Sequence, residues 1–153
     1  MRAAPSSAVF APGEPGRRGT AVPVIETLGK TARYALGGVR IVAGATGLLA
    51  PAMIISRFGE GNPRDNPAAI YGLRLFGVRT VLIGVDLIRL RGPELDRALR
   101  AAPLIHASDT ATVLTLQRNK QLSPEHARPL ALISGLNTVL AVTAYLAARR
   151  SRP

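Results

Sequence analysis

The sequence contains no cysteine and no tryptophan, and aromatic residues make up only 4% of its 153 positions. Without cysteine there can be no disulfide, no thiolate nucleophile and no Cys-ligated zinc or iron–sulfur site. With so few aromatic residues, a water-soluble core would have to be built from Ala, Leu, Val and Ile alone. A protein whose apolar side chains face lipid needs no such core.

Familiar catalytic and nucleotide-binding motifs are also missing. There is no phosphate-binding Gly-Lys-Ser/Thr loop, no dinucleotide fingerprint, no paired catalytic His motif and no nucleophile elbow. Acidic residues are scarce, with 9 Asp and Glu against 20 Lys and Arg, and the net charge is +11. Because the basic residues flank the apolar blocks, we interpret them as signals of membrane topology and expect no nucleic-acid partner. We also predict no catalytic residue, no bound metal and no cofactor.

The apolar residues fall into four long blocks, at about 34–56, 70–88, 98–116 and 129–148. The last block has no charged residue between Arg128 and Arg149, and it matches the roughly 20 residues that a bilayer requires. The two middle blocks carry charges, but they have spanning length and are bounded by short polar turns. We therefore predict an all-α, antiparallel four-helix bundle in the membrane over residues 34–148. The alternative is two spans with two amphipathic helices.

Polar, basic segments flank the predicted bundle. Residues 1–33 are predicted to be a disordered tail, because four prolines before Glu26 oppose a helix and no signal-peptide apolar run is present. Residues 149–153 form a short basic tail. If the N-terminus is cytoplasmic, 12 Lys and Arg lie inside and 5 outside, so both termini are predicted to be cytoplasmic. Heavy use of Ala, Arg, Gly and Pro suggests a bacterium, and thus its inner (plasma) membrane.

Ionisable residues inside a membrane are costly, so the few within the blocks are the candidate site. They are Arg40, Arg74, Arg79, Asp86, His106 and Asp109. Depths estimated from the helical rise pair Arg40 with Asp86, and Arg79 with Asp109. These pairs either fix the register of the helices and bind nothing, or line a polar cavity for an anionic head group or a proton path.

His106 and Asp109 are three residues apart, a spacing that suits two ligands of a metal ion. No third or fourth ligand is visible in the sequence, so a structural or proton-sharing role is favoured for His106. Asn137 is expected either to hydrogen-bond across the bundle or to bond to its own backbone.

Small residues recur at positions where neighbouring helices would touch, and they permit close approach of two backbones. They are Gly37, Ala43, Gly44 and Gly47 in the first block, Gly72, Gly77 and Gly84 in the second, and Ala131 and Gly135 in the fourth.

Several short runs resemble a known family. The runs are residues 40–44 (RIVAG), 48–51 (LLAP), 57–59 (RFG), 66–67 (NP) and 74–79 (RLFGVR), followed later by Asp109. Over residues 34–148 they resemble small bacterial membrane proteins of the domain-of-unknown-function 4267 type, and more distantly DoxX-like proteins. The resemblance implies four membrane spans and points to Arg40, Arg74, Arg79 and Asp109, but it implies no activity.

The function predicted from the sequence is that of a small accessory or assembly subunit of a larger membrane complex, with other membrane subunits or a second copy as partners. The alternative is a carrier or sensor for a small molecule, a lipid head group or protons, centred on Arg79 and Asp109. An intramembrane enzyme is a third possibility, but acid–base catalysis needs convergent groups of matched pKa.

Overall fold

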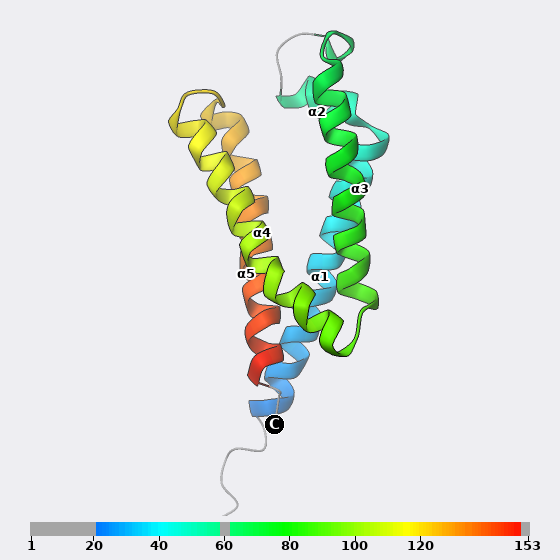
Figure 1. The fold of residues 1–153 in the computed structure, drawn as a ribbon. Helices are drawn as coiled ribbons and strands as arrows, with labels where there is room; N and C mark the ends of the chain where they lie inside the picture. Colours follow the sequence, from blue (N-terminus) through cyan, green and yellow to red (C-terminus); the bar gives the residue numbers. More distant parts are fainter. Residues whose placement is uncertain (1–20, 59–61, 151–153) are drawn as a thin grey trace, which may run out of the picture.

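The computed structural model describes residues 21–58 and 62–150, and its described part is entirely helical (Figure 1). Five α-helices and one 3-10 turn make up these residues. They are α1 (Ala21–Leu49), α2 (Pro51–Phe58), η1 (Pro63–Asp65), α3 (Pro67–Arg89), α4 (Gly92–Arg118) and α5 (Pro124–Arg150).

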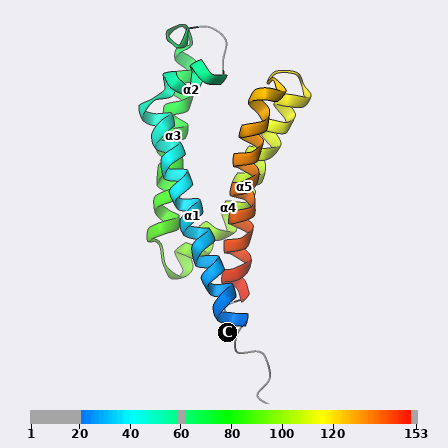
Figure 2. The same cartoon turned by 180° about the vertical axis from the view of Figure 1, so that it is seen from behind.

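The long helices form two arms that diverge like a V (Figures 1 and 2). α1 packs along α3 in one arm, and α4 packs along α5 in the other. The arms meet at one end of the molecule, which holds the start of α1, the α3–α4 turn and the end of α5 (Figure 1). A compact apolar cluster fills this junction, formed by Ala32, Leu36, Leu87, Leu99, Ala102, Ala141 and Ala144.

The α1–α3 arm is built on glycines that let the two backbones touch. A Cβ atom added at Gly44 would lie 2.7 Å from the carbonyl oxygen of Gly77, and one added at Gly84 would lie 2.7 Å from that of Gly37. Such distances leave no room for any side chain, so only glycine fits. Because Gly37 faces Gly84 and Gly44 faces Gly77, α1 and α3 run in opposite directions. The expected close approach of glycines is therefore confirmed for this arm.

Two of the predicted contact glycines lie elsewhere. A Cβ atom at Gly72 or at Gly135 would meet no other atom within 4 Å, so neither residue is at a close helix contact. Gly72 lies on the same helix as Gly77, and this makes it a natural control for the glycine seam.

The first helix begins much earlier than the sequence indicated. The predicted tail covered residues 1–33, but α1 starts at Ala21, and only residues 1–20 of that tail lie outside the described residues. Pro23 is the reason that the start of this helix was predicted too late. It stands in the first turn of α1, where a backbone N–H has no helical acceptor and proline costs little.

The predicted first span, residues 34–56, is also wrong as a continuous helix. α1 ends at Leu49, and α2 begins at Pro51 after a bend of 93°. Pro51 causes the break, because its ring disfavours the helical conformation at Ala50 and it has no N–H to donate.

Two helices are long and apolar enough to cross a membrane, α3 and α5, and the bent pair of α1 and α2 makes a third if it is counted as one span. α3 contains the predicted second block, 70–88, and α5 contains the predicted fourth block, 129–148. α4 contains the third block, 98–116, but it does not reach the same apolarity. The chain thus has the character of a helical membrane protein with two to three clear spanning segments.

The glycine seam gives a direct stability prediction. Gly77→Ala should lower the free energy of unfolding in bicelles by about 1–3 kcal/mol, because the new methyl group overlaps the α1 backbone. Gly72→Ala is the matched control on the same helix and should be neutral or stabilising by up to about 1 kcal/mol, because alanine favours the helix. Equal effects of the two substitutions would show that α1 and α3 do not meet at this seam.

Candidate functional site

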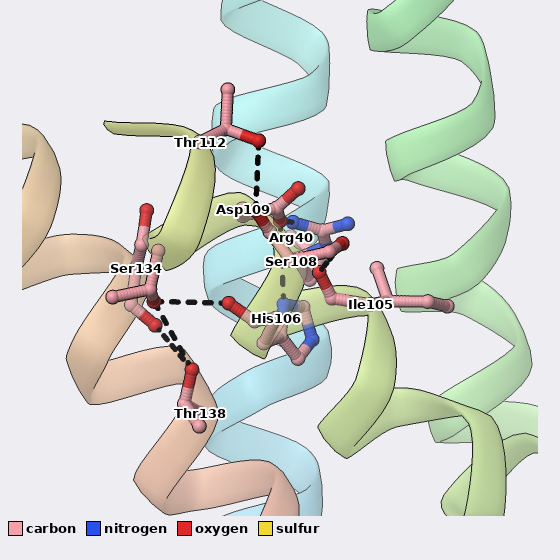
Figure 3. Close-up of polar contacts among 9 residues, drawn as sticks. Arg40, Ile105, His106, Ser108, Asp109, Thr112, Ser134 and Thr138 are labelled. Atoms are coloured by element: carbon pink, nitrogen blue, oxygen red, sulfur yellow. Dashed lines mark hydrogen bonds and ion pairs between the residues drawn. The ribbon is translucent and has the colours of Figure 1, made fainter. Parts of the chain in front are cut away.

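An ion pair joins the two arms close to the level where they part. Arg40 of α1 is only 5% exposed, and its Nη1 donates a hydrogen bond of 3.2 Å to Oδ2 of Asp109 on α4 (Figure 3). The Asp109 side chain is 36% exposed, so it is the more open member of the pair. A guanidinium has five N–H donors, and the Nε donor of Arg40 has no acceptor among the described residues.

His106 lies one turn before Asp109 on α4 and is completely buried. Its Nδ1 is 3.6 Å from the same Asp109 Oδ2 that accepts from Arg40, which is too long for a hydrogen bond (Figure 3). Within the described part of the chain, neither ring nitrogen has a hydrogen-bond partner. A fully buried imidazole without partners is costly, because both of its nitrogens lose water and gain nothing in return.

Hydroxyl groups extend the polar region from α4 to α5. Thr110 Oγ1 donates to the His106 carbonyl at 3.0 Å, and Thr138 Oγ1 donates to the Ser134 carbonyl at 2.9 Å. The two hydroxyls are 3.3 Å apart (Figure 3). Since each carries a single proton, a bond between them requires one to release its own backbone carbonyl. This network can therefore exchange hydrogen-bond partners without moving a helix.

Asn137 of α5 is a third buried polar side chain, 5% exposed, and its Oδ1 has no donor among the described residues. Its height in the molecule follows from the contact between Gly29 of α1 and Ala147 of α5. Arg40 lies about three turns along α1 from this contact, and Asn137 about three turns back along α5. The two residues therefore stand at a similar level. We call the contacting residues Arg40, His106 and Asp109, together with Asn137 at a similar level on α5, the polar centre.

The predicted charge pairs are not the ones that form. Asp86 and Arg79 are both exposed, and neither makes an ion pair with a described residue, whereas Arg40 pairs with Asp109. Each of the two lies two residues from a glycine of the seam, Gly84 or Gly77, which turns it about 200° around α3 and away from α1. The predicted Arg40–Asp86 and Arg79–Asp109 pairs are wrong for this reason. Arg74 is exposed as well, so α3 contributes no charge to the centre.

Arg33 is a buried charged residue whose role the sequence did not reveal. Its Nε donates to the Leu87 carbonyl at 2.6 Å, and its Nη2 donates to the Ile88 carbonyl at 3.0 Å. These carbonyls lie in the last turn of α3, where no helical N–H remains to bond them. Arg33 thus caps α3 from the neighbouring helix and complements its dipole.

Metal binding finds no support at this site. Among the described residues, no group of three or more His, Asp or Glu side chains is placed to hold a metal ion. His106 and Asp109 do lie together, but the cation beside them is Arg40.

Comparisons with known proteins give no further information on this site. No protein family matches the sequence, and neither a curated protein nor a solved structure matches it. The resemblance to proteins of the domain-of-unknown-function 4267 type stays a prediction based on the short runs quoted above.

The observed pairing makes a testable distinction between two arginines. Asp109→Asn should lower the unfolding free energy by about 1–3 kcal/mol, less than for a fully buried pair because the Asp109 carboxylate is partly exposed. Arg79→Gln, which removes an exposed charge of the same type, should change it by no more than about 0.5 kcal/mol. Reversible unfolding in mixed micelles measures both, and a larger loss from Arg79→Gln would contradict the observed pairing.

Proposed function

We propose that this is a small integral membrane protein that binds an uncharged polar ligand at the polar centre, as a carrier or sensor. One observation carries the proposal. Three side chains from three helices, Arg40, His106 and Asn137, are at least nine-tenths buried and keep unpartnered polar atoms. Buried polar groups are nearly always hydrogen-bonded in proteins, and in a membrane the cost of leaving them unpaired is higher. A bound molecule that pairs with them removes this cost.

The charges of the centre select the kind of ligand. Arg40 and Asp109 neutralise one another, so an added ion would bring an uncompensated charge into a poorly solvated place. The unpaired atoms comprise a donor on Arg40, an acceptor on Asn137 and the two His106 nitrogens, one of which donates when the ring is neutral. A molecule that both donates and accepts hydrogen bonds, such as one with hydroxyl or amide groups, satisfies this set.

The ligand is proposed to reach the polar centre from the side of Asp109. Asp109 is the one member of the polar centre that is not buried, which indicates that the centre is reached from its side. The hydroxyls of Thr110 and Thr138 link α4 to α5 beside the His106 carbonyl and can exchange hydrogen-bond partners without backbone movement.

The membrane arrangement proposed with this function is a four-crossing, antiparallel one in a bacterial inner membrane, with both termini cytoplasmic. α4 is the least apolar of the four proposed crossings, and the polar residues that it turns toward the protein lower its average hydropathy. His106 is buried and Asp109 is paired, so much of the polarity of α4 faces protein rather than lipid. The excess of Lys and Arg at the end where α1 begins and α5 ends supports the orientation.

An accessory subunit remains the second candidate, and the diverging arms favour it. Long apolar side chains of the α4–α5 arm are exposed, with Leu104 at 75% and Leu132 at 74%. In a membrane these side chains contact either lipid or the helices of another subunit.

Ligand binding is tested by what the protein retains on purification. Wild-type protein extracted from its native membrane in mild detergent should carry close to one small polar molecule per chain, detected by mass spectrometry of the denatured sample. His106→Leu should lose it, because two of the unpaired nitrogens disappear. His126→Leu is the matched control, since the chain has 2 histidines and His126 lies outside the polar centre, and it should retain the molecule.

Identical extracts from wild type and His106→Leu would refute the ligand proposal. A protein partner retained in fixed ratio by both variants would support the accessory-subunit function instead.

The crossing of α4 is tested by cysteine labelling, which is clean because the chain contains no cysteine of its own. A cysteine at Ser123, beyond the end of α4, should react with a membrane-impermeant maleimide in intact cells. A cysteine at Pro93, at the start of α4, should react only after the cells are opened. Labelling of both from the same side would show that α4 lies along the surface.

A further inference from the structure

The short helix α2 has a geometry suited to the surface of a bilayer. It follows α1 after a bend of 93°, so if α1 crosses the membrane, α2 lies along its plane (Figure 1). It contacts η1 and α3, and Figure 1 places it beside the end of the molecule where α3 begins. α3 has 23 residues and is about 34 Å long, close to the hydrocarbon thickness, which puts its first turn at the interface.

The side chains of α2 divide between protein and surroundings. Pro51 and Ile55 are buried, whereas Met53 is 59% exposed and Arg57 is exposed in the last turn. This is the pattern of an interfacial helix, with an apolar residue available to the acyl region and a basic residue available to head groups. At the end of α2, the Phe58 ring meets His126 of α5 edge-on, with ring centroids 5.8 Å apart.

A hollow of about 630 Å³ lies beside α2, and its lining residues suit a lipid molecule. Its lining residues are Thr46, Met53, Ile54, Ser56, Arg57 and Phe58. Arg57 is its only charged residue, and three of the others are apolar. The Thr46 and Ser56 hydroxyls donate to carbonyls of their own helices, to Val42 and Ala52, which leaves Arg57 as the principal donor. A second hollow of about 360 Å³, on the α5 side, is lined by both Arg57 and Glu125, so we place the anion site in the first hollow, whose lining contains no carboxylate.

Among the described residues, Arg57 has no ion-pair partner, so its guanidinium can bind an outside anion. Guanidinium groups bind phosphate oxygens in pairs. The described part of this end of the molecule is also basic, which adds long-range attraction for anionic lipid. Its charged residues are Arg57, Arg64, Arg118, Lys120 and Arg128 against Asp65 and Glu125.

We infer that the hollow beside α2 is a binding site for the head group of an anionic phospholipid, with Arg57 on the phosphate and Met53, Ile54 and Phe58 against the glycerol and upper acyl chains. This site is separate from the polar centre, because the two share no residue and Thr46, the lining residue nearest to Arg40 in the sequence, lies about 9 Å further along α1. It does not depend on the ligand proposed for the polar centre.

Native mass spectrometry of the delipidated, detergent-solubilised protein tests the site, with phosphatidylglycerol and phosphatidylcholine added as the two probes. Wild-type protein should bind one phosphatidylglycerol more tightly than any phosphatidylcholine. Arg57→Gln should weaken the tightest phosphatidylglycerol binding about five-fold, the effect of one basic residue at a membrane surface. The substitution replaces an exposed side chain, so folding should be unaffected, and the unfolding transition checks this.

The matched control is Arg118→Gln, which removes an exposed arginine at the same end of the molecule but outside both hollows. Its phosphatidylglycerol affinity should equal that of wild type. Equal weakening by Arg57→Gln and Arg118→Gln would reduce the effect to general surface charge and overturn the proposed site. Unchanged binding in Arg57→Gln, or equal binding of the two lipids by wild type, would overturn it as well.

Discussion

The contact between Arg40 and Asp109 is the constraint on which the arrangement of the two arms depends. Within the α1–α3 arm, packing is supplied by glycines, whereas alanines of α5 pack at the junction of the two arms. Between the arms, the apolar cluster lies at the junction, and the ion pair stands near the level where the arms part. An ion pair is directional where apolar packing is not, and the burial of Arg40 leaves Asp109 as its one charged partner among the described residues. It therefore sets the position of α1 against α4 at that level.

This constraint also explains why polar atoms occur so deep in the molecule. Holding a charged pair between helices is costly unless further hydrogen bonds support it, yet His106 and Asn137 bring unpaired polar atoms to the same region. A bundle selected for stability alone would place apolar residues there. The presence of these groups is explained if they bind a ligand, and the partly exposed Asp109 side chain provides access to them.

Sequence reasoning singled out six residues, of which the structure brings Arg40, His106 and Asp109 together and leaves the three on α3 exposed, and it assigned the wrong partners. Arg40, His106 and Asp109 stand out because charged and titratable residues are rare within apolar blocks. Depth along a helix follows from counting residues, whereas the face of the helix depends on how it is rotated against its neighbour. The glycine seam fixes that rotation, and it turns Asp86 and Arg79 outward. The break at Ala50 was readable from Pro51, whereas Pro23 misled because proline is tolerated in a first helical turn.

The central claim is that the polar centre holds a ligand, and a high-resolution structure of the purified protein in lipid nanodiscs tests it most directly. We expect non-protein density within hydrogen-bonding distance of Arg40 Nε and a His106 ring nitrogen, with Asn137 as a further contact. A structure in which these three side chains pair only with one another and with Asp109 would contradict it, and would leave the polar centre as a purely structural link between the arms.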